Sequence, residues 1–195
     1  MDAVWGSLGD SVSPIKELEG KKPFVIGVTG KARSGKDTLS EHLYTRLGFD
    51  CNRAAFADPV KDMLRAIGID NIEGYKEEVH PLLGVTSRKM MQTLGTEWGR
   101  EAIGEDTWIN LTKEKGKGKK FLVISDVRFE NEANFVRENG ILLHVTGRGG
   151  IKGFHKSESG VKFQLGDFRI DNSYEIEYLF SQADTLLKMA GLYDC

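Results

Sequence analysis

The feature that most constrains the fold is a short apolar run, followed at once by a glycine-rich loop and then by a helix. Residues Phe24–Thr29 are mostly apolar with β-branched members, which is typical of a strand buried on both faces. The loop at 30–38 reads Gly-Lys-Ala-Arg-Ser-Gly-Lys-Asp-Thr. Beyond it, Leu39, Leu43 and Leu47 recur every four residues and form one helical face. This order predicts a strand–loop–helix unit of an α/β protein.

The loop has the pattern G-x-x-x-x-G-K, which predicts binding of a nucleoside triphosphate. Small residues let backbone N–H groups converge on phosphate oxygens, and the following helix adds its positive N-terminus. Lys36 is expected to reach the β- and γ-phosphates. Asp37 stands where Ser or Thr normally follows the Lys, so the sequence leaves open whether Asp37 or Thr38 attends Mg²⁺. A tight turn with a chance match is the alternative. The candidate nucleotide-binding residues here are Gly30, Ala32, Ser34, Gly35, Lys36, Asp37 and Thr38.

Further strand and helix patterns alternate along the chain. Short strands are expected at Arg53–Ala57, Phe121–Ile124, Ile141–Val145 and Phe168–Ile170. Helices are expected after an Asp58-Pro59 cap, through most of 70–111 with breaks at Gly84, Gly95 and Gly104, over Glu130–Asn139, and after Asn172-Ser173. Alternating strands and helices predict a parallel sheet with helices on both faces.

The expected organisation is one α/β domain over 23–195, preceded by a loose arm at 1–22. A helical insert at about 58–111 is expected to bind the acceptor, and a lid is expected at about 147–160. The formal net charge of −2 gives no support for a protein that coats nucleic acid. No apolar run approaches the ~20 residues that span a bilayer. Cys51 and Cys195 lie far apart, which argues against a disulfide framework or zinc site and favours a reducing cytoplasm.

Two polar residues follow the strand predicted at 121–124. Asp126 comes directly after its carboxyl end, which in an α/β sheet faces the ligand crevice. A carboxylate there binds Mg²⁺ through water or orients a substrate. Arg128 is expected to face the same cleft, where its planar fork suits the charge of a transferring phosphoryl group. A surface Asp–Arg pair is the alternative interpretation.

The insert offers candidate acceptor-binding residues. Gln92, Thr96 and Arg100 recur at four-residue spacing and face one way if the helix survives Gly95. Gln can recognise a base edge, and Arg can hold an acceptor phosphate. Further candidates are Lys61 and Arg88 for phosphate, and Trp98 or Trp108 for stacking a base, against solvation of the cations and ordinary core packing of the indoles.

Two more candidates lie near the end of the chain. The Gly-rich segment 147–160 carries Arg148, Lys152, His155 and Lys156, and the expected lid residue is Arg148. A solvated loop is the alternative. Asn172 follows the last strand, where it either meets the adenine of ATP or caps the final helix.

Five segments together resemble the bacteriophage-type deoxynucleoside monophosphate kinases. They are Gly-Lys-Ala-Arg-Ser-Gly-Lys-Asp-Thr (30–38), Phe-Ala-Asp-Pro-Val-Lys (56–61), Gln-Thr-Leu-Gly-Thr-Glu-Trp-Gly-Arg (92–100), Ile-Ser-Asp-Val-Arg-Phe-Glu-Asn-Glu (124–132) and His-Lys-Ser-Glu (155–158). The resemblance runs from about Phe24 to Leu187. It implies a P-loop kinase fold, similar to adenylate and guanylate kinases, and transfer of the ATP γ-phosphoryl to a dNMP with Mg²⁺.

Carried over by position, the resemblance puts Lys36 on the ATP phosphates and Arg128 between the donor and acceptor phosphates, as the two catalytic residues. It puts Gln92 and Arg100 in the acceptor pocket. Cytoplasmic location, in the host cytoplasm if the chain is phage-encoded, is expected, with no nucleic-acid or membrane partner; monomer and homodimer both stay open. The alternatives are a kinase of dephospho-coenzyme A or phosphomevalonate type, and an ATP-binding switch without an acceptor.

Overall fold

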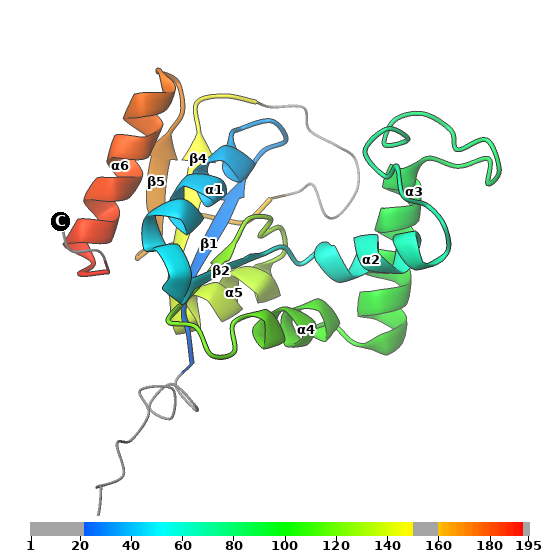
Figure 1. Ribbon diagram of the computed structural model, residues 1–195, viewed down its shortest axis with the longest axis horizontal. Helices are drawn as coiled ribbons and strands as arrows, with labels where there is room; N and C mark the ends of the chain where they lie inside the picture. The colour runs from blue at the N-terminus through cyan, green and yellow to red at the C-terminus, as the bar shows by residue number, and fades with distance from the viewer. Residues whose placement is uncertain (1–21, 150–159, 193–195) are drawn as a thin grey trace, which may run out of the picture.

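A five-stranded parallel sheet forms the centre of the protein. The computed structural model describes residues 22–149 and 160–192; all but the last residue of the predicted arm, and most of the predicted lid, lie outside these ranges. The strands run in the order β2-β3-β1-β4-β5 (Figure 1). Their bounds are β1 Phe24–Gly30, β2 Cys51–Ala54, β3 Phe121–Ile124, β4 Gly140–Thr146 and β5 Phe168–Asp171. The predicted parallel sheet is therefore confirmed.

Each face of the sheet packs against its own helices. Alternate residues of β1 serve the two faces, because Ile26 and Val28 join one buried cluster and Val25 joins the other. Helices α1 (Lys36–Leu47) and α6 (Ile176–Met189) cover the first face; α5 (Glu130–Asn139) and α4 (Thr107–Lys115) cover the second (Figure 1). At Gly27 a Cβ would lie 2.7 Å from Val136, so glycine lets α5 approach the central strand closely. The carboxyl end of β1 therefore lies in the middle of one edge of the sheet.

The insert between β2 and β3 projects to one side of the sheet (Figure 1). It contains α2 (Asp58–Ala66), α3 (Ser87–Gln92), the π-helical segment η2 (Thr93–Ile103) and α4. The prediction that most of 70–111 is helical is wrong for its first part: 67–86 is non-helical, with one bridge between Val79 and Thr86. Asp58 is also not a cap; its side chain accepts a hydrogen bond from the backbone N–H of Ala55 at 2.8 Å.

Gly95, which was predicted to break the insert's helix, lies inside it, and Gly99 is a packing position. The helix continues from α3 through Gly95 and ends only at Gly104. The indole Nε1 of Trp108 donates to the carbonyl of Gly95 at 2.7 Å, and a Cβ on Gly99 would lie 2.1 Å from the Trp108 ring. Glycine at position 99 therefore lets the helix backbone lie directly on the indole.

The segment that re-enters the sheet before β5 is fixed to α5 by Arg137. Arg137 binds both oxygens of the Asp167 carboxylate at 2.9 and 2.8 Å and donates to the carbonyl of Lys162 at 2.8 Å. Asp167 also accepts from the backbone of Gln164 and pairs with His144. Burial alone would raise the pKa of Asp167, but the hydrogen bonds, led by that from Arg137, outweigh it and lower the pKa to about 2.

Replacing Arg137 with methionine is expected to lower the free energy of unfolding, and to lower it more at neutral pH than in acid. Because the folded pKa of Asp167 is depressed, its contribution is present above the unfolded pKa near 4 and is lost as pH falls through about 2. At neutral pH the loss is expected to be at most about 2 kcal/mol. Urea unfolding at pH 7 and pH 3 measures it: the wild-type–variant difference should shrink at pH 3. The control is Arg65→Met, which breaks an exposed pair with Asp62 and should stay within about 0.5 kcal/mol of wild type. If Arg137→Met lost the same free energy of unfolding at both pH values, the link to the Asp167 carboxylate would be contradicted.

Candidate active site

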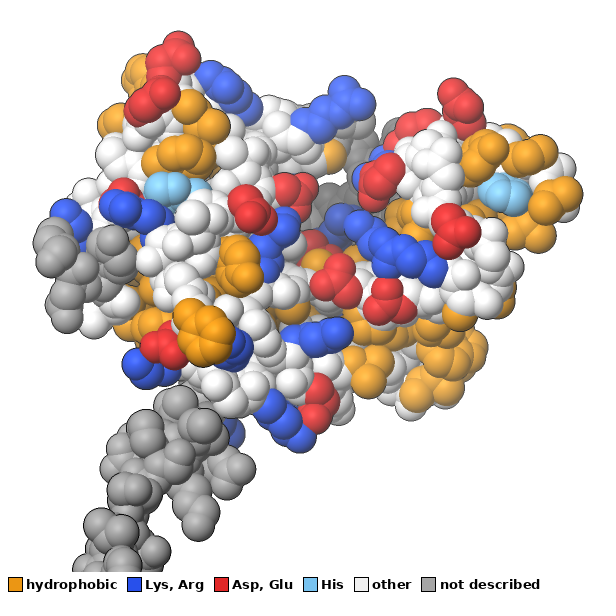
Figure 2. Space-filling view, in the orientation of Figure 1, with side chains coloured by type: hydrophobic (Ala, Val, Ile, Leu, Met, Phe, Trp, Pro, Cys, Tyr) orange, Lys and Arg blue, Asp and Glu red, His pale blue; other side chains and the backbone are white. Residues whose placement is uncertain are grey.

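A deep cleft of about 1500 Å³ opens at the carboxyl edge of the sheet, between the glycine-rich loop and the insert. Figure 2 shows the hollow, with basic and acidic side chains gathered around it. Its floor comes from the ends of β1, β2, β3 and β4, and its far wall from the insert. The predicted site residues that line it are Gly30, Ala32, Lys36, Asp37, Lys61, Arg88, Gln92, Arg100, Asp126, Arg128 and Arg148. Residues from five separate stretches of the chain therefore share one space.

The glycine-rich loop is shaped to hold an anion. Gly35 has φ +97°, a conformation that L side chains rarely adopt, and α1 begins at the next residue. The side-chain amide of Asn172 donates to the carbonyl of Ser34 at 2.8 Å, and a Cβ on Gly35 would lie 2.5 Å from that amide nitrogen. The buried hydroxyl of Ser34 has no hydrogen-bond partner among the described residues. The anion site is therefore carried by the helix N-terminus and the loop backbone, which favour a phosphate group.

Lys36 and Arg128 supply positive charge to the cleft. The ammonium group of Lys36 donates to the carbonyl of Lys31 at 2.7 Å, which keeps it over the loop. Burial, and after it the charge of Arg128, lowers the pKa of Lys36, while Asp37 and Asp126 oppose the shift. The exposed guanidinium of Arg128 makes no hydrogen bond or ion pair with the rest of the described chain. Arg128 is thus a cation of this cleft that the described residues leave available.

Asp126 holds the start of the insert in place. Its two carboxylate oxygens accept from the backbone N–H groups of Phe56 at 2.7 Å and Ala57 at 3.1 Å. Burial raises the pKa of Asp126, and the charge of Arg128 and these hydrogen bonds oppose the shift. The residue lines the cleft as predicted, but its contacts within the chain are with backbone. Contact with Mg²⁺ or substrate stays a prediction.

Arg100 is engaged in a buried ion pair with Glu132. Their side chains are only 8% and 2% exposed. The Arg100 guanidinium also stacks on Phe129 and donates to the carbonyl of Glu105. Burial, and then the charge of Asp126, raises the pKa of Glu132 to about 7, and Arg100 opposes this. In this structure Arg100 therefore fixes the insert to the start of α5, at the wall of the cleft.

Glu132 was missed by the sequence reasoning. Its other carboxylate oxygen accepts from the backbone N–H groups of Arg128 at 2.7 Å and Phe129 at 3.0 Å, at the start of α5. Glu132 thereby fixes the backbone that carries Arg128. A signal was present, because a glutamate in the first turn of a predicted helix commonly binds N–H groups just before that helix.

The other insert candidates divide into those at the cleft and those away from it. Gln92 and Thr96 line the cleft with Arg100, so the three residues share a face as predicted. Among the two indoles, Trp108 lines the cleft and is buried, whereas Trp98 is 42% exposed and is not part of the lining. Trp98, proposed from the sequence to stack a base, lies instead on the outside of the insert against Trp108.

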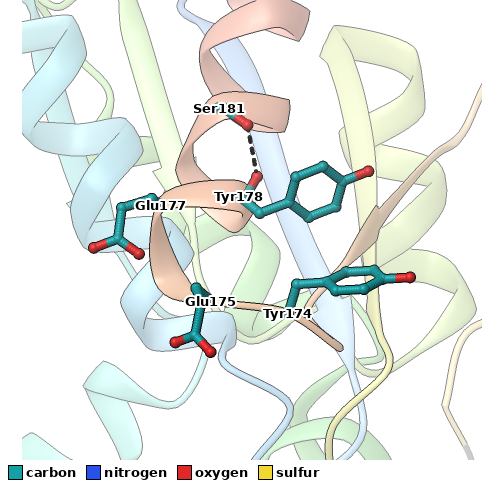
Figure 3. A pocket seen from close by; sticks show the side chains of 5 residues that line it. All are labelled: Tyr174, Glu175, Glu177, Tyr178 and Ser181. Atoms are coloured by element: carbon teal, nitrogen blue, oxygen red, sulfur yellow. Dashed lines mark hydrogen bonds between the residues drawn. The ribbon is translucent and has the colours of Figure 1, made fainter.

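A second, shallow hollow lies beside the loop, where the chain leaves β5. Tyr174, Tyr178, Glu175, Glu177 and Ser181 line it. Figure 3 shows the rings of Tyr174 and Tyr178 on one side of the ribbon and the two carboxylates on the other. Arg148 lines the main cleft and donates to the carbonyl of Tyr174 at 2.7 Å, so it links the cleft to this hollow. The expected capping role of Asn172 is wrong, because α6 begins at Ile176 and Asn172 supports the loop.

The candidate metal ligands differ in position. Asp37 lines the cleft, and Thr38 is exposed but not part of the lining. In the part of the chain that the structure describes, no three His, Cys, Asp or Glu side chains gather to hold a metal ion. A hydrated Mg²⁺ bound mainly through nucleotide phosphates needs one or two carboxylates only, so Asp37 and Asp126 are a fitting donor set.

Comparison with known proteins gives the family. The sequence profile of the deoxynucleotide monophosphate kinases matches residues 83–183. A protein of Acanthamoeba polyphaga mimivirus named for the same kinase activity is 31% identical over 182 residues, covering 81% of this chain and 93% of its own length. The chain belongs to the deoxynucleotide monophosphate kinase family. It is therefore a phosphotransferase, and the P-loop kinase fold expected from the resemblance is confirmed.

Other similarities are more partial. The deoxynucleoside-5'-monophosphate kinase of Escherichia phage T5 is 31% identical over 111 residues, which cover 51% of this chain and 44% of the phage protein. Among solved structures, a sugar kinase from Janibacter sp. HTCC2649 covers 89% of this chain and 99% of its own, with 17% identity and a TM-score of 0.44. A gluconokinase from Sinorhizobium meliloti 1021 covers 88% and 97%, with 12% identity and a TM-score of 0.43. At these scores the solved structures carry no inference about this chain.

No membrane-crossing helix was found in the described part of the chain, since none of its helices is both long and apolar enough.

Proposed function

We propose that this kinase transfers the γ-phosphoryl group of ATP to a deoxynucleoside monophosphate, giving ADP and a dNDP. The observation that supports it is the single cleft that joins the glycine-rich loop, with its helix N-terminus and Lys36, to an insert wall that carries Gln92 and Lys61. A donor triphosphate fits the loop, and a phosphorylated acceptor fits the space between the loop and the insert. Membership of the kinase family supports the same reaction.

The chemistry asks for positioning and charge rather than for a general base. An oxygen of the acceptor phosphate, already ionised near neutral pH, forms a bond to the γ-phosphorus as the bond to the β,γ-bridging oxygen breaks. Charge accumulates on the transferring group and the leaving oxygen. Lys36 lies on the loop side of the cleft, and Arg128 carries a guanidinium that no described residue binds. We infer that these two cations stabilise that charge.

The remaining residues position the substrates. The loop 30–36 holds the donor phosphates through backbone N–H groups, with Asn172 behind it. On the acceptor side, Gln92 and Thr96 offer polar groups to a base, and Trp108 adds apolar surface to the lining. Asp37 and Asp126 would hold the waters of Mg²⁺, which neutralises phosphate charge when bound. The lid residue Arg148 is tied to Tyr174 at the donor side of the cleft.

An acceptor panel tests the proposal. Purified enzyme with ATP and Mg²⁺ is offered each dNMP, the matching ribonucleotides, dephospho-coenzyme A and phosphomevalonate, and ADP release is coupled to a spectrophotometric readout. At least one dNMP is expected to raise ADP release far above the rate without acceptor. Turnover confined to a non-nucleotide acceptor would replace the proposed substrate. Acceptor-independent ATP hydrolysis would favour the ATP-driven switch.

A further inference from the structure

The insert carries a lysine that faces the cleft and has no assigned part in the reaction. Lys76 lies in the non-helical stretch before α3 and lines the cleft opposite the glycine-rich loop. Its ammonium group is bound to the carboxylate of Glu73 at 2.9 Å. The other oxygen of Glu73 lies 3.4 Å from the ammonium group of Lys61. One carboxylate therefore gathers two lysines at the wall where an acceptor phosphate would lie.

This stretch and the donor loop contribute charges to the same cleft. Burial and Arg128 are the main causes that lower the pKa of Lys36, and the charge of Lys76 adds to them. Glu77, beside Lys76, has its pKa lowered chiefly by a hydrogen bond from Arg88, and Arg33 of the donor loop contributes as well. Lys76 and Glu77 line the same cleft as Arg33 and Lys36 of the loop, so these charges share one space.

We propose that Lys76 binds the acceptor phosphate, and that Glu73 is a positioning residue that holds Lys76 and Lys61 at the cleft. The Lys76 ammonium group has three N–H donors and Glu73 takes one of them, so phosphate oxygens would accept from the others while Glu73 keeps the lysine in place. Placed on the acceptor side, Lys76 would meet the acceptor while Lys36 meets the donor. This inference rests on the proposed function for the identity of the acceptor.

Replacing Lys76 with methionine keeps the aliphatic stem and removes the charge. The expected result is a rise of about ten- to hundredfold in the KM for the dNMP, with the KM for ATP within about twofold of wild type. Lys76→Arg should recover part of the loss, and Glu73→Gln should raise the same KM by a smaller factor. Thermal melting of each variant shows whether the fold persists.

The matched control is Lys117→Met. Lys117 also pairs with a glutamate three residues earlier, Glu114, but on the surface of α4's C-terminal turn and away from the cleft. It should leave both KM values unchanged. A dNMP KM for Lys76→Met within twofold of wild type would overturn the proposal, and so would an equal rise in the ATP KM.

A binding measurement separates this proposal from the proposed function. If the wild-type enzyme turned over no dNMP, the proposed function would fail. Calorimetric titration with inorganic phosphate, in the presence of a non-hydrolysable ATP analogue, would still compare wild type with Lys76→Met. If Lys76→Met bound phosphate more weakly than wild type, the role of Lys76 would be supported. Equal phosphate binding by the two proteins would refute it.

Discussion

Replacing Lys36 with methionine is expected to lower kcat by about 10²–10³-fold while the protein stays folded. The ammonium group lies on the glycine-rich loop, bonded to the carbonyl of Lys31, and its removal takes away one charge from the donor phosphates. Methionine keeps most of the aliphatic stem, so the start of α1 should change little. Steady-state kinetics of ADP formation measures the effect, with the thermal midpoint measured alongside.

The exposed Lys117→Met variant controls for loss of any lysine charge and should retain wild-type kcat. A Lys36→Met enzyme with near-normal turnover would remove the loop from the donor site. Loss of turnover together with a collapsed thermal midpoint would instead give Lys36 a structural role.

Arg128→Met should depress kcat to a similar extent and leave the free energy of unfolding nearly unchanged. The reason is the contrast with Arg100: the guanidinium of Arg128 contacts no hydrogen-bonding partner in the described chain, whereas that of Arg100 is buried against Glu132. A cation without internal partners contributes to substrates rather than to folding. Chemical denaturation and steady-state kinetics on the same preparation separate the two quantities.

Arg128→Lys is the informative companion. It keeps the charge but loses the two-pronged geometry of the guanidinium, so kcat should fall to an intermediate value. The KM for ATP should change by less than kcat in both variants. A lowered thermal midpoint with unaltered kcat would show that Arg128 belongs to the scaffold.

Much of the fold could be predicted from local pattern. The strand Phe121–Ile124 and the helix Glu130–Asn139 have the predicted bounds. Both are set by short-range signals: a continuous apolar run, and a polar helix closed by Gly140. The same reasoning fails at 70–86, which was expected to be mostly helical and is not. It also misjudges Gly95 as a helix break, and it gives no reason for Gly99, whose reason for being glycine is the Trp108 ring on the next helix.

The positions of site residues at strand ends were predictable, but the side-chain contacts that hold them were not. Lys36, Asp126 and Arg128 share the cleft because parallel strands place their carboxyl ends at one edge. The partners of these residues could not be read from spacing. Arg100 meets Glu132 through the packing of the insert on α5, and Asn172 meets Ser34 across 138 positions of sequence. Such contacts are products of tertiary structure.

The sheet order has a consequence for how such an enzyme can diversify. Because β1 lies at the centre, the chain passes to one side for β2 and β3 and to the other for β4 and β5. The insert between β2 and β3 is therefore one contiguous stretch, separate from the residues after β4 and β5 that adjoin the loop. Exchange of that stretch would alter the proposed acceptor wall and leave the glycine-rich loop and its support from Asn172 unchanged. A new insert would still have to cover the sheet face that α4 packs on and to supply the partner that Arg100 gives Glu132. We therefore expect related enzymes of different acceptor specificity to keep these two contacts.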